Sequence, residues 1–333
     1  MQIAPAVENS MAQTRRVRFR FRIAGRRWEF PRRRPHFGRR TPVAAGLQPI
    51  AAPAIVTAQE ATLAPVRLQR WPILASAGSL DVRIAETDQE IDAAQRLRYR
   101  VFYEEMCAIP TPEMRAQHRD FDHYDAFCDH LLVVDRDVRD EKGEPAVVGT
   151  YRLLRGEVAA LHGGYYTSSE YDLAPMVDAN PPGTRFLELG RSCVLKPYRP
   201  RQVTMQLLWR GIILYLHRHA IDVMFGCGSL PGIDPEALAL PLSYLHHFHR
   251  SPEGQRLRAR SELYVEMNRM SKESIDMKEA LRSLPPLIKG YVRIGSYIGD
   301  GAVIDRQFGT TDVLIYFPVS RLDKRLHSRS IRE

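Results

Sequence analysis

Cysteine is scarce in this chain, and no cysteine is placed for a disulfide framework or a metal site. Four occur among 333 residues, Cys107, Cys128, Cys193 and Cys227. They form no C-x-x-C pair and have no metal-ligand spacing to His. Scattered single cysteines in a chain of this length indicate a reducing compartment, where they serve as small buried hydrophobes. We therefore expect no disulfide, no metal ion and a cytoplasmic location.

Long apolar runs are also missing. No stretch of 18 or more apolar residues occurs, so the sequence predicts no transmembrane helix. Residues 42–58, PVAAGLQPIAAPAIVTA, follow a basic stretch as the apolar part of an export signal would. However, they start far from the N-terminus and contain three prolines. We interpret them as an Ala/Pro-rich linker rather than an export signal.

Acidic residues are almost absent from residues 15–40, which hold twelve Arg and one Glu. This segment carries a charge of +11, which leaves −2 for the rest of a chain whose net charge is +9. The basicity therefore belongs to a segment, and we expect residues 1–78 to be an unstructured basic and Ala/Pro-rich tail. Contact with anionic lipids, nucleic-acid binding and a true start farther downstream are three explanations for this tail.

The remaining residues alternate between strand and helix patterns and are expected to form one domain over 79–325, followed by a basic tail over 326–333. Thr87 and Glu90 have the spacing of a capping box before the first helix. Strands are predicted over 80–85, 129–135, 146–155, 186–194, 221–229, 291–298 and 312–319, and helices over 88–106, 203–220 and within 235–267.

Several charged residues stand inside these apolar patterns. Buried charges are strongly destabilising unless they are paired, so the charged residues should pair with one another where the sheet opens. Clusters of this kind mark functional sites, although purely structural networks also occur. The acidic loop DFDHYD (120–125) lacks the spacing of a calcium-binding EF-hand loop. The expected members are Arg98, Asp120, Asp122, Asp125, Arg152, Glu188 and Arg191.

The segment VLKPYRPR (194–201) joins a predicted strand to a predicted helix. Backbone N–H groups at a helix N-terminus attract phosphate, and basic side chains strengthen that attraction. Taken alone, the segment is better explained as an ordinary strand–helix connection that carries surface arginines.

Four motifs in this order resemble the GNAT-like acyltransferases: RYRVF (98–102), DFDHYD (120–125), VVGTYRL (147–153) and ELGR (188–191). Within that group the chain is similar to N-acyl-homoserine lactone synthases and, more closely, to L-ornithine N-alpha-acyltransferases. Residues 225–235 and 284–313 extend the second similarity, so the resemblance covers residues 80–325. It implies an α/β (α+β) fold with a mixed central sheet and helices on both faces.

The resemblance implies transfer of an acyl or 3-hydroxyacyl chain from acyl carrier protein to the alpha-amine of L-ornithine, without a cofactor. Lactone synthases carry a Trp where this chain has Ala108, which argues against a site for S-adenosylmethionine. The loop at 196–202 lacks the glycines of acetyl-CoA-dependent relatives and suits the single phosphate of a phosphopantetheine arm. A lactone synthase or another N-acyl amino acid synthase is the alternative enzyme, and a basic adaptor is the non-enzymatic alternative.

The resemblance also suggests roles for residues at the acceptor end of the site. Glu188 is the expected base, with a pKa set by burial against the pull of Arg191. Asp122 and Asp125 would hold the acceptor or orient Arg98 and Arg152, and one arginine of the set would clamp the ornithine carboxylate. Asp305 and Asp312 are both candidates for holding a second ammonium group, and the sequence does not choose between them.

The donor end of the predicted site is apolar and basic. Phe102 is expected to line the acyl channel, with the donor arm lying along Cys193 and Val194. Cys193 is interpreted as a buried thiol rather than a nucleophile. Arg199 and Arg201 are expected to bind the phosphate or to dock acyl carrier protein. Because the implied product is a lipid, we favour contact of the basic tail with the inner face of the cell membrane and expect no nucleic-acid partner.

Overall fold

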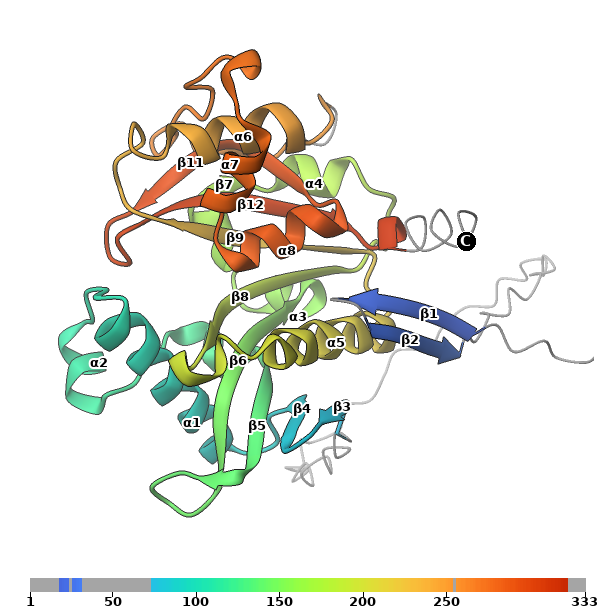
Figure 1. Cartoon of the computed structure of the whole chain (residues 1–333), viewed down its shortest axis with the longest axis vertical. Helices are drawn as coiled ribbons and strands as arrows, with labels where there is room; N and C mark the ends of the chain where they lie inside the picture. Colours follow the sequence, from blue (N-terminus) through green and yellow to red (C-terminus); the bar gives the residue numbers. More distant parts are fainter. Residues whose placement is uncertain (1–17, 24–25, 32–72, 254–255, 323–333) are drawn as a thin grey trace, which may run out of the picture. The chain divides into compact units, whose positions relative to one another are not determined.

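The computed structural model describes residues 18–23, 26–31, 73–253 and 256–322 (Figure 1). The chain divides into two units, Met1–Gln69 and Arg70–Glu333. In the first unit β1 (Arg18–Ile23) and β2 (Arg26–Pro31) pair in antiparallel fashion. The prediction for residues 1–78 missed this hairpin, although the alternation RFRFRI has the period of a strand. The predicted linker over 42–58 and the basic tail over 326–333 lie outside the described residues.

A mixed sheet of ten strands runs through the second unit in the order β3-β4-β5-β6-β8-β9-β12-β11-β10-β7. The pairs β8–β9 and β10–β11 are parallel, and the other neighbours are antiparallel. Its strands are β3 (Ala75–Ala77), β4 (Leu80–Ile84), β5 (Asp129–Arg139), β6 (Pro145–Arg155), β7 (Tyr171–Asp172), β8 (Phe186–Val194), β9 (Val223–Pro231), β10 (Arg258–Ala259), β11 (Tyr297–Asp305) and β12 (Thr310–Pro318).

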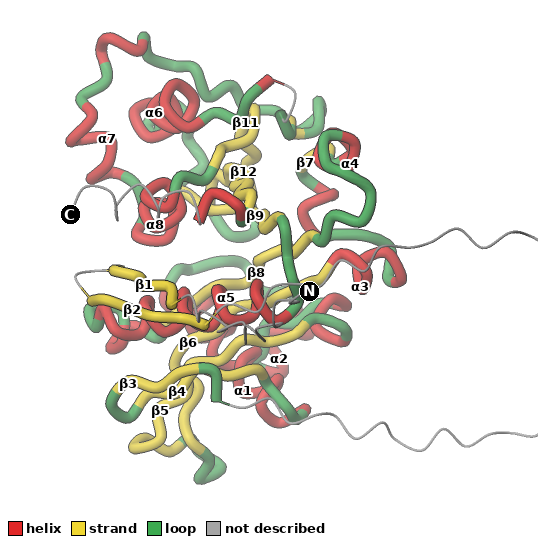
Figure 2. The backbone as a smooth tube through the Cα atoms, turned by 90° about the vertical axis from the view of Figure 1, so that its right-hand side faces the viewer, coloured by secondary structure: helices red, strands yellow, loops and turns green. Residues whose placement is uncertain are grey.

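Helices cover both faces of this sheet, as the sequence predicts. Alternate residues of β5 show why, since Leu131 and Val133 pack in the core that contains α5, while Leu132 and Val134 pack against α1. In Figure 2, α6, α7 and α8 lie on one side of β9, β11 and β12, and α4 lies on the other. The helices are α1 (Asp88–Tyr99), α2 (Pro112–Gln117), α3 (Gly156–Leu161), α4 (Ala174–Asp178), α5 (Gln202–Arg218), α6 (Ala239–His249), α7 (Met277–Ser283) and α8 (Pro286–Ile294).

Helix α1 begins as predicted, because the Thr87 side chain accepts a hydrogen bond from the Glu90 backbone N–H. The Glu90 carboxylate reaches back to the N–H of Glu86 rather than to that of Thr87. The helix continues as a π-helix over Arg100–Glu105. Such wider turns are rare and occur frequently at functional sites.

Two predicted elements are wrong. Residues 291–298 were expected as a strand, but helix α8 occupies 286–294 and β11 begins only at Tyr297. Pro286 at the first helical position and Gly295 in the left-handed conformation after the last one bound this helix. In the stretch 235–267 the α-helix is α6 alone, which ends before the Ser251-Pro252 pair.

The sheet opens between β8 and β9, where it is parallel for only three residue pairs, Phe186–Val223 to Glu188–Phe225. Beyond Glu188 the two strands separate (Figure 1). Gly226 lies at this branch point, and a Cβ atom added there would stand 2.2 Å from the carbonyl oxygen of Leu189. Only glycine permits this close approach of the two backbones.

Strand β8 also carries a bulge at the opening. Its pairing with β6 passes from Thr150–Cys193 to Arg152–Gly190, so Arg191 and Ser192 together oppose the single residue Tyr151. Arg191 adopts a positive φ of 50°, which a non-glycine residue rarely does. Bulges of this kind redirect side chains and leave backbone groups unpaired, and they are common beside active sites.

Within the part of the chain that the structure describes, no helix combines the length and the apolar character that crossing a bilayer requires.

Candidate active site

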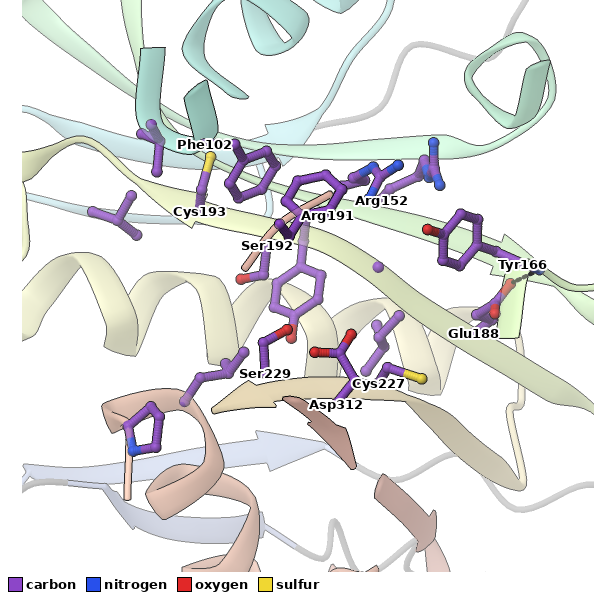
Figure 3. Close-up of a pocket in the computed structure, with 18 of the residues that line it drawn as sticks. Phe102, Arg152, Tyr166, Glu188, Arg191, Ser192, Cys193, Cys227, Ser229 and Asp312 are labelled. Atoms are coloured by element: carbon purple, nitrogen blue, oxygen red, sulfur yellow. Dashed lines mark hydrogen bonds between the residues drawn. The ribbon is translucent and has the colours of Figure 1, made fainter. Parts of the chain in front are cut away.

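A cavity of about 490 Å³ fills the opening between β8 and β9 (Figure 3). Strand β8 lines it with every residue from Leu189 to Val194, and the facing wall includes Cys227 and Ser229 of β9 and Asp312 of β12. This volume is within the range of small-molecule sites in proteins.

The structure divides the predicted site residues into two groups. One group lines the cavity: Phe102, Arg152, Glu188, Arg191, Cys193, Val194 and Arg199. The other group does not: Arg98, Asp122, Asp125 and Arg201. The first three residues of this second group, together with Asp120, form an ionic layer behind the cavity wall.

Arg98 is the centre of this ionic layer and is fully buried. Its guanidinium donates to Asp120 Oδ2 at 2.7 Å and to the Asp125 carboxylate at 2.8 Å. Burial alone would raise the pKa of Asp125, but the charge and hydrogen bonds of Arg98 outweigh it and lower that pKa to about 2. Tyr103 adds a hydrogen bond to Asp120 at 2.8 Å. The layer is thus paired internally, as the buried-charge argument predicts.

Asp122 connects this layer to the cavity. It caps the short 3-10 helix η2 (His123–Ala126) in a capping box with Asp125. Its carboxylate accepts a hydrogen bond from Arg152 at 2.6 Å and one from Arg191 at 3.4 Å. Because the acidic loop holds arginines in this way, its carboxylates are positioned to orient guanidinium groups rather than to face the cavity.

Arg191 projects from the bulge of β8 into the cavity. Its guanidinium carbon lies 5.0 Å from the ring centre of Tyr166 and 4.9 Å from that of Phe308, which are cation–π distances. Burial opposes its charge, but Asp120 and its other anionic neighbours raise its pKa, so it stays protonated. Its Nε has no hydrogen bond among the described residues, but it is buried and lies 3.6 Å from Asp120 Oδ2 of the ionic layer. Arg191 therefore adds a positive charge to the cavity wall.

Glu188 has partners other than the predicted ones. Its carboxylate accepts hydrogen bonds from the backbone N–H groups of Tyr166 at 3.0 Å and Thr167 at 2.7 Å, in the 3-10 helix η3 (Tyr166–Ser169). Burial raises its pKa, and the bonds from Thr167 and Tyr166 and the charge of Arg152 oppose that rise. The opposing charge is thus that of Arg152, rather than that of Arg191 as predicted from the sequence.

Tyr166 and Thr167 line the cavity and bind Glu188, and the sequence did not predict them. They belong to a stretch without clear periodicity between two predicted strands, and nothing in their local sequence marks them. Figure 3 shows Tyr166 beside Glu188 at one end of the cavity, with Arg152 and Arg191 nearby. This end of the cavity is therefore polar and charged.

The other end of the cavity is apolar and contains the predicted donor-binding residues. Phe102 lines it together with Met205 and Leu287. Arg199 donates to the carbonyl oxygen of Val194 at 2.8 Å and also pairs with Glu105 of the π-helix. Arg201 is exposed and stacks on the ring of Tyr198 outside the cavity, at 4.7 Å. Of the two arginines, only Arg199 is placed to meet a ligand in the cavity.

Cys193 lies at the cavity wall, and burial raises the pKa of its thiol to about 12. The nucleophilic form of cysteine is the thiolate, and a thiol with this pKa is protonated at neutral pH. The prediction that Cys193 is a buried thiol agrees with this environment.

Comparison with known proteins relates the chain to acyltransferases. Residues 97–210 match the family model described as "Acetyltransferase (GNAT) domain". The chain is 50% identical over 253 residues to the L-ornithine N(alpha)-acyltransferase of Rhizobium meliloti (strain 1021), covering 76% of this chain and 84% of that protein. It is 49% identical over 248 residues to the protein of the same name from Agrobacterium fabrum, covering 74% and 84%.

Among solved structures, FeeM, an N-acyl amino acid synthase from uncultured soil microbes, is 13% identical, with a TM-score of 0.39 over 72% of this chain and 91% of that one. Because that overall agreement is weak, the fold assignment rests on the family model and on the strand order.

Proposed function

The chain belongs to the L-ornithine N(alpha)-acyltransferase family, and we propose that it transfers an acyl or 3-hydroxyacyl chain from acyl carrier protein to the alpha-amine of L-ornithine. The product would be lyso-ornithine lipid. The observation that carries this proposal is the cavity between β8 and β9, which combines an apolar end with an end that holds two guanidinium groups and the buried carboxylate of Glu188.

The reaction needs no covalent enzyme intermediate. The neutral amine attacks the carbonyl carbon of the thioester and forms the carbon–nitrogen bond. The tetrahedral intermediate then collapses, which breaks the carbon–sulfur bond and releases the phosphopantetheine thiolate. A base takes the proton that the ammonium group must lose, and the leaving thiolate gains a proton.

Glu188 is the proposed base, acting directly or through a water molecule. Its pKa is raised by burial, which makes the carboxylate a stronger base than an exposed Glu. Its bonds to the backbone of Tyr166 and Thr167 fix its orientation at the cavity wall. General-base catalysis of this kind contributes about 10²–10⁴-fold.

The bulge of β8 is the proposed oxyanion site. Arg191 and Ser192 face a single residue of β6, so the bulge frees backbone hydrogen-bonding capacity at the cavity wall. A backbone N–H from Ser192 or Cys193 would stabilise the oxygen of the tetrahedral intermediate. The loss of one such donor costs roughly 3–4 kcal/mol of transition-state stabilisation.

The arginines at the polar end are proposed to bind the alpha-carboxylate of the acceptor. Arg191 and Arg152 both line the cavity. A guanidinium can hold a carboxylate through two parallel hydrogen bonds. Asp122, Asp125 and Arg98 are then positioning residues, which fix the two guanidinium groups from behind.

Acyl carrier protein is the proposed donor. The phosphopantetheine arm would follow Val194 toward the N-terminus of α5, where Arg199 could meet its single phosphate. The exposed Arg201 is placed to contact the acidic carrier protein rather than the arm. No protein-bound cofactor takes part in this scheme.

A panel of acceptors tests the proposed function. Purified full-length protein is incubated with 3-hydroxyacyl carrier protein and with ornithine, lysine, glutamine or glycine, and products are identified by mass spectrometry. We expect N-acylornithine as the main product. An acyl lactone, or no acyl amide with any acceptor, would contradict the proposal.

Replacing Cys193 with Ala should leave turnover within about threefold of wild type, because a thiol with a pKa of about 12 carries no acyl intermediate. Steady-state release of the carrier-protein thiol measures this. Abolished turnover in a folded C193A protein, together with an acylated Cys193 in wild type, would establish an acyl-enzyme route instead.

Peripheral contact with anionic membrane lipids through residues 15–40 is part of the same proposal. Each basic residue near an anionic surface contributes about 1 kcal/mol of attraction. The full chain should co-sediment with anionic vesicles, and a chain without residues 1–69 should not. Equal sedimentation of the two proteins would remove this role from the basic segment.

A further inference from the structure

Three carboxylates that do not belong to the ionic layer gather at the polar end of the cavity. Glu170 follows η3, Asp305 ends β11, and Asp312 lies within β12. One oxygen from each lies within 4.8 Å of the others. Glu170 is 8% exposed and Asp312 is 7% exposed. Three acidic groups from distant parts of the sequence are thus held together in a largely buried place.

No basic residue forms a salt bridge with these carboxylates within the described ranges. Asp312 accepts a hydrogen bond from Thr310 Oγ1 at 2.9 Å, and Glu170 accepts one from the thiol of Cys227 at 3.2 Å. Asp305 accepts two bonds from backbone N–H groups. Each group therefore has neutral donors but no ion pair, in contrast to Asp120 and Asp125 in the ionic layer, and the positive charge of Arg191 acts on Glu170 and Asp312 from a longer distance.

Burial without a direct ion pair raises the pKa values of these carboxyl groups, although the charge of Arg191 opposes the rise. Burial, reinforced by the charge of Asp312, raises the pKa of Glu170 to about 7. Burial, reinforced by the charge of Asp305, raises the pKa of Asp312 to about 6 in spite of hydrogen bonds from Thr310 and Ser229. Like charges held this close raise the free energy of the empty site, and a bound cation would lower it.

The position of the group relates it to the acceptor. Asp305 and Asp312 line the cavity, and Glu170 lies close behind them. In Figure 3 Asp312 and Cys227 are on one wall, and Arg191 and Arg152 are on the opposite wall. A cavity with guanidinium groups on one wall and carboxylates on the other is complementary to a molecule that has a carboxylate at one end and an ammonium group at the other.

We propose that Asp305 and Asp312, supported by Glu170, bind the side-chain ammonium of the acceptor and select amino acids that carry a second amino group. This inference rests on the proposed function. An ammonium group has three N–H donors, and these carboxylates offer at least that number of acceptors. With the carboxylate on the arginine wall and the side-chain ammonium on the acidic wall, the alpha-amine is left free for the thioester.

The proposal makes the discrimination between acceptors measurable. L-norvaline has the carbon skeleton of L-ornithine without the terminal amine, so it would leave the buried carboxylates without their cation. Sites that bind a polar group in this way reject the analogue that lacks it by large factors, on the order of 10² or more. Wild-type protein should therefore show a kcat/KM for ornithine about 10²-fold or more above that for norvaline.

Asp312→Asn should lower this ratio at least tenfold, mainly by lowering kcat/KM for ornithine. Glu170→Gln and Asp305→Asn should also lower this ratio. These two variants provide the test if D312N does not fold. Asp178→Asn is the matched control, since Asp178 is exposed on α4 and does not line the cavity. An unchanged ratio in all three cavity variants, with wild type active on ornithine, would overturn this inference and leave the proposed function standing.

The pH dependence of protein stability shows whether Glu170 serves to bind a ligand or to stabilise the fold. In the folded protein Glu170 keeps its proton up to about pH 7, whereas an unfolded Glu loses it near its ordinary value of 4.5. Folding therefore takes up a proton in this range, and the stability of wild type should fall as the pH rises from about 4.5 to 7. Asp312, with a pKa of about 6, adds to the decline in the lower part of this range, so Glu170→Gln should reduce the decline rather than abolish it, and it should raise the melting temperature at pH 8. A lower melting temperature at pH 8 would indicate a structural role.

A divalent metal ion is the rival occupant. Calorimetric titration with Mg²⁺, Mn²⁺ or Ca²⁺ should give the same result for the wild-type protein and for D312N, because no metal ion binds at the three carboxylates. EDTA should not reduce acyl transfer. Metal binding lost in D312N, together with activity lost in EDTA, would assign the cluster to a metal ion.

Failure of the wild-type protein to acylate any amino acid would refute the proposed function itself, and not only the role of the three carboxylates.

Discussion

Replacing Glu188 with Gln should lower kcat by more than about tenfold, and by up to 10⁴-fold if Glu188 is the sole base. The amide cannot take the proton of the attacking ammonium group. The KM for the acyl carrier protein thioester should stay within about threefold, because Glu188 lies at the end of the cavity opposite the apolar donor channel. Steady-state kinetics of thiol release measure both quantities.

The same substitution has a cost in stability that must be measured alongside. Glu188 accepts two backbone N–H groups, and the NH₂ of Gln would face one of them. We expect a loss of about 1–3 kcal/mol in the free energy of unfolding, with the protein still folded. Glu157→Gln, at an exposed residue outside the cavity, is the control. Retained turnover in folded E188Q would move the role of base to another residue.

Replacing Arg98 with Ala should destabilise the protein by about 3–5 kcal/mol, the typical cost of removing one partner from a buried ionic group. Asp120 and Asp125 would be left buried without their central cation. Urea unfolding followed by circular dichroism measures the change. The pKa of Asp125 is held at about 2 in wild type, so its stabilising contribution is present above pH 3.8 and is lost as the pH falls toward 2.

Arg96 on the same helix provides a matched control. Its ion pair with Asp92 is at the surface, with the Arg96 side chain 50% exposed. Arg96→Ala should cost less than about 1 kcal/mol, as surface pairs do. If R98A and R96A were equally stable, the ionic layer would not hold the site together. If R98A folds at low temperature, its turnover should also fall, because the layer fixes Arg152 and Arg191.

The ionic layer could be predicted because the physical constraint is strict. Arg98 on a helix and Arg152 on a strand are embedded in apolar patterns, and buried charges require partners. The acidic loop at 120–125 was the available source of those partners, and the structure places its carboxylates on these arginines. Charge balance thus predicted a contact between segments far apart in the sequence.

The same reasoning predicted Glu188 as a member of the cluster but not its partners, and it did not predict Glu170. The carboxylate of Glu188 accepts hydrogen bonds from the backbone of η3. Every non-proline residue has a backbone N–H, so the sequence does not show which residues donate these bonds. Glu170 forms no salt bridge within the described residues, so an argument from charge pairing could not predict its position. Asp305 and Asp312 were recognised as candidates for an ammonium site, but only the sheet order brings them beside Glu170.

Some helices and strands could also be predicted from the sequence, and others could not. Strands β5, β6 and β8 could be predicted because long apolar patterns and turns bound them. The segment 291–298 is apolar with β-branched residues and was predicted as a strand, but the spacing of Ile288, Tyr291 and Val292 places one buried face on helix α8. The bulge at Arg191 depends on pairing with β6, so no local pattern in β8 predicts it.

The most direct test of the account uses L-ornithine that carries ¹⁵N only at the alpha-nitrogen, with 3-hydroxyacyl carrier protein and the purified full-length chain. Tandem mass spectrometry locates the acyl group on one nitrogen, and thiol release is measured in parallel. The account predicts an acyl group on the labelled nitrogen, with one thiol released per acylornithine formed. Acylation of the unlabelled side-chain nitrogen, or thiol release without an acylated amino acid, would contradict it.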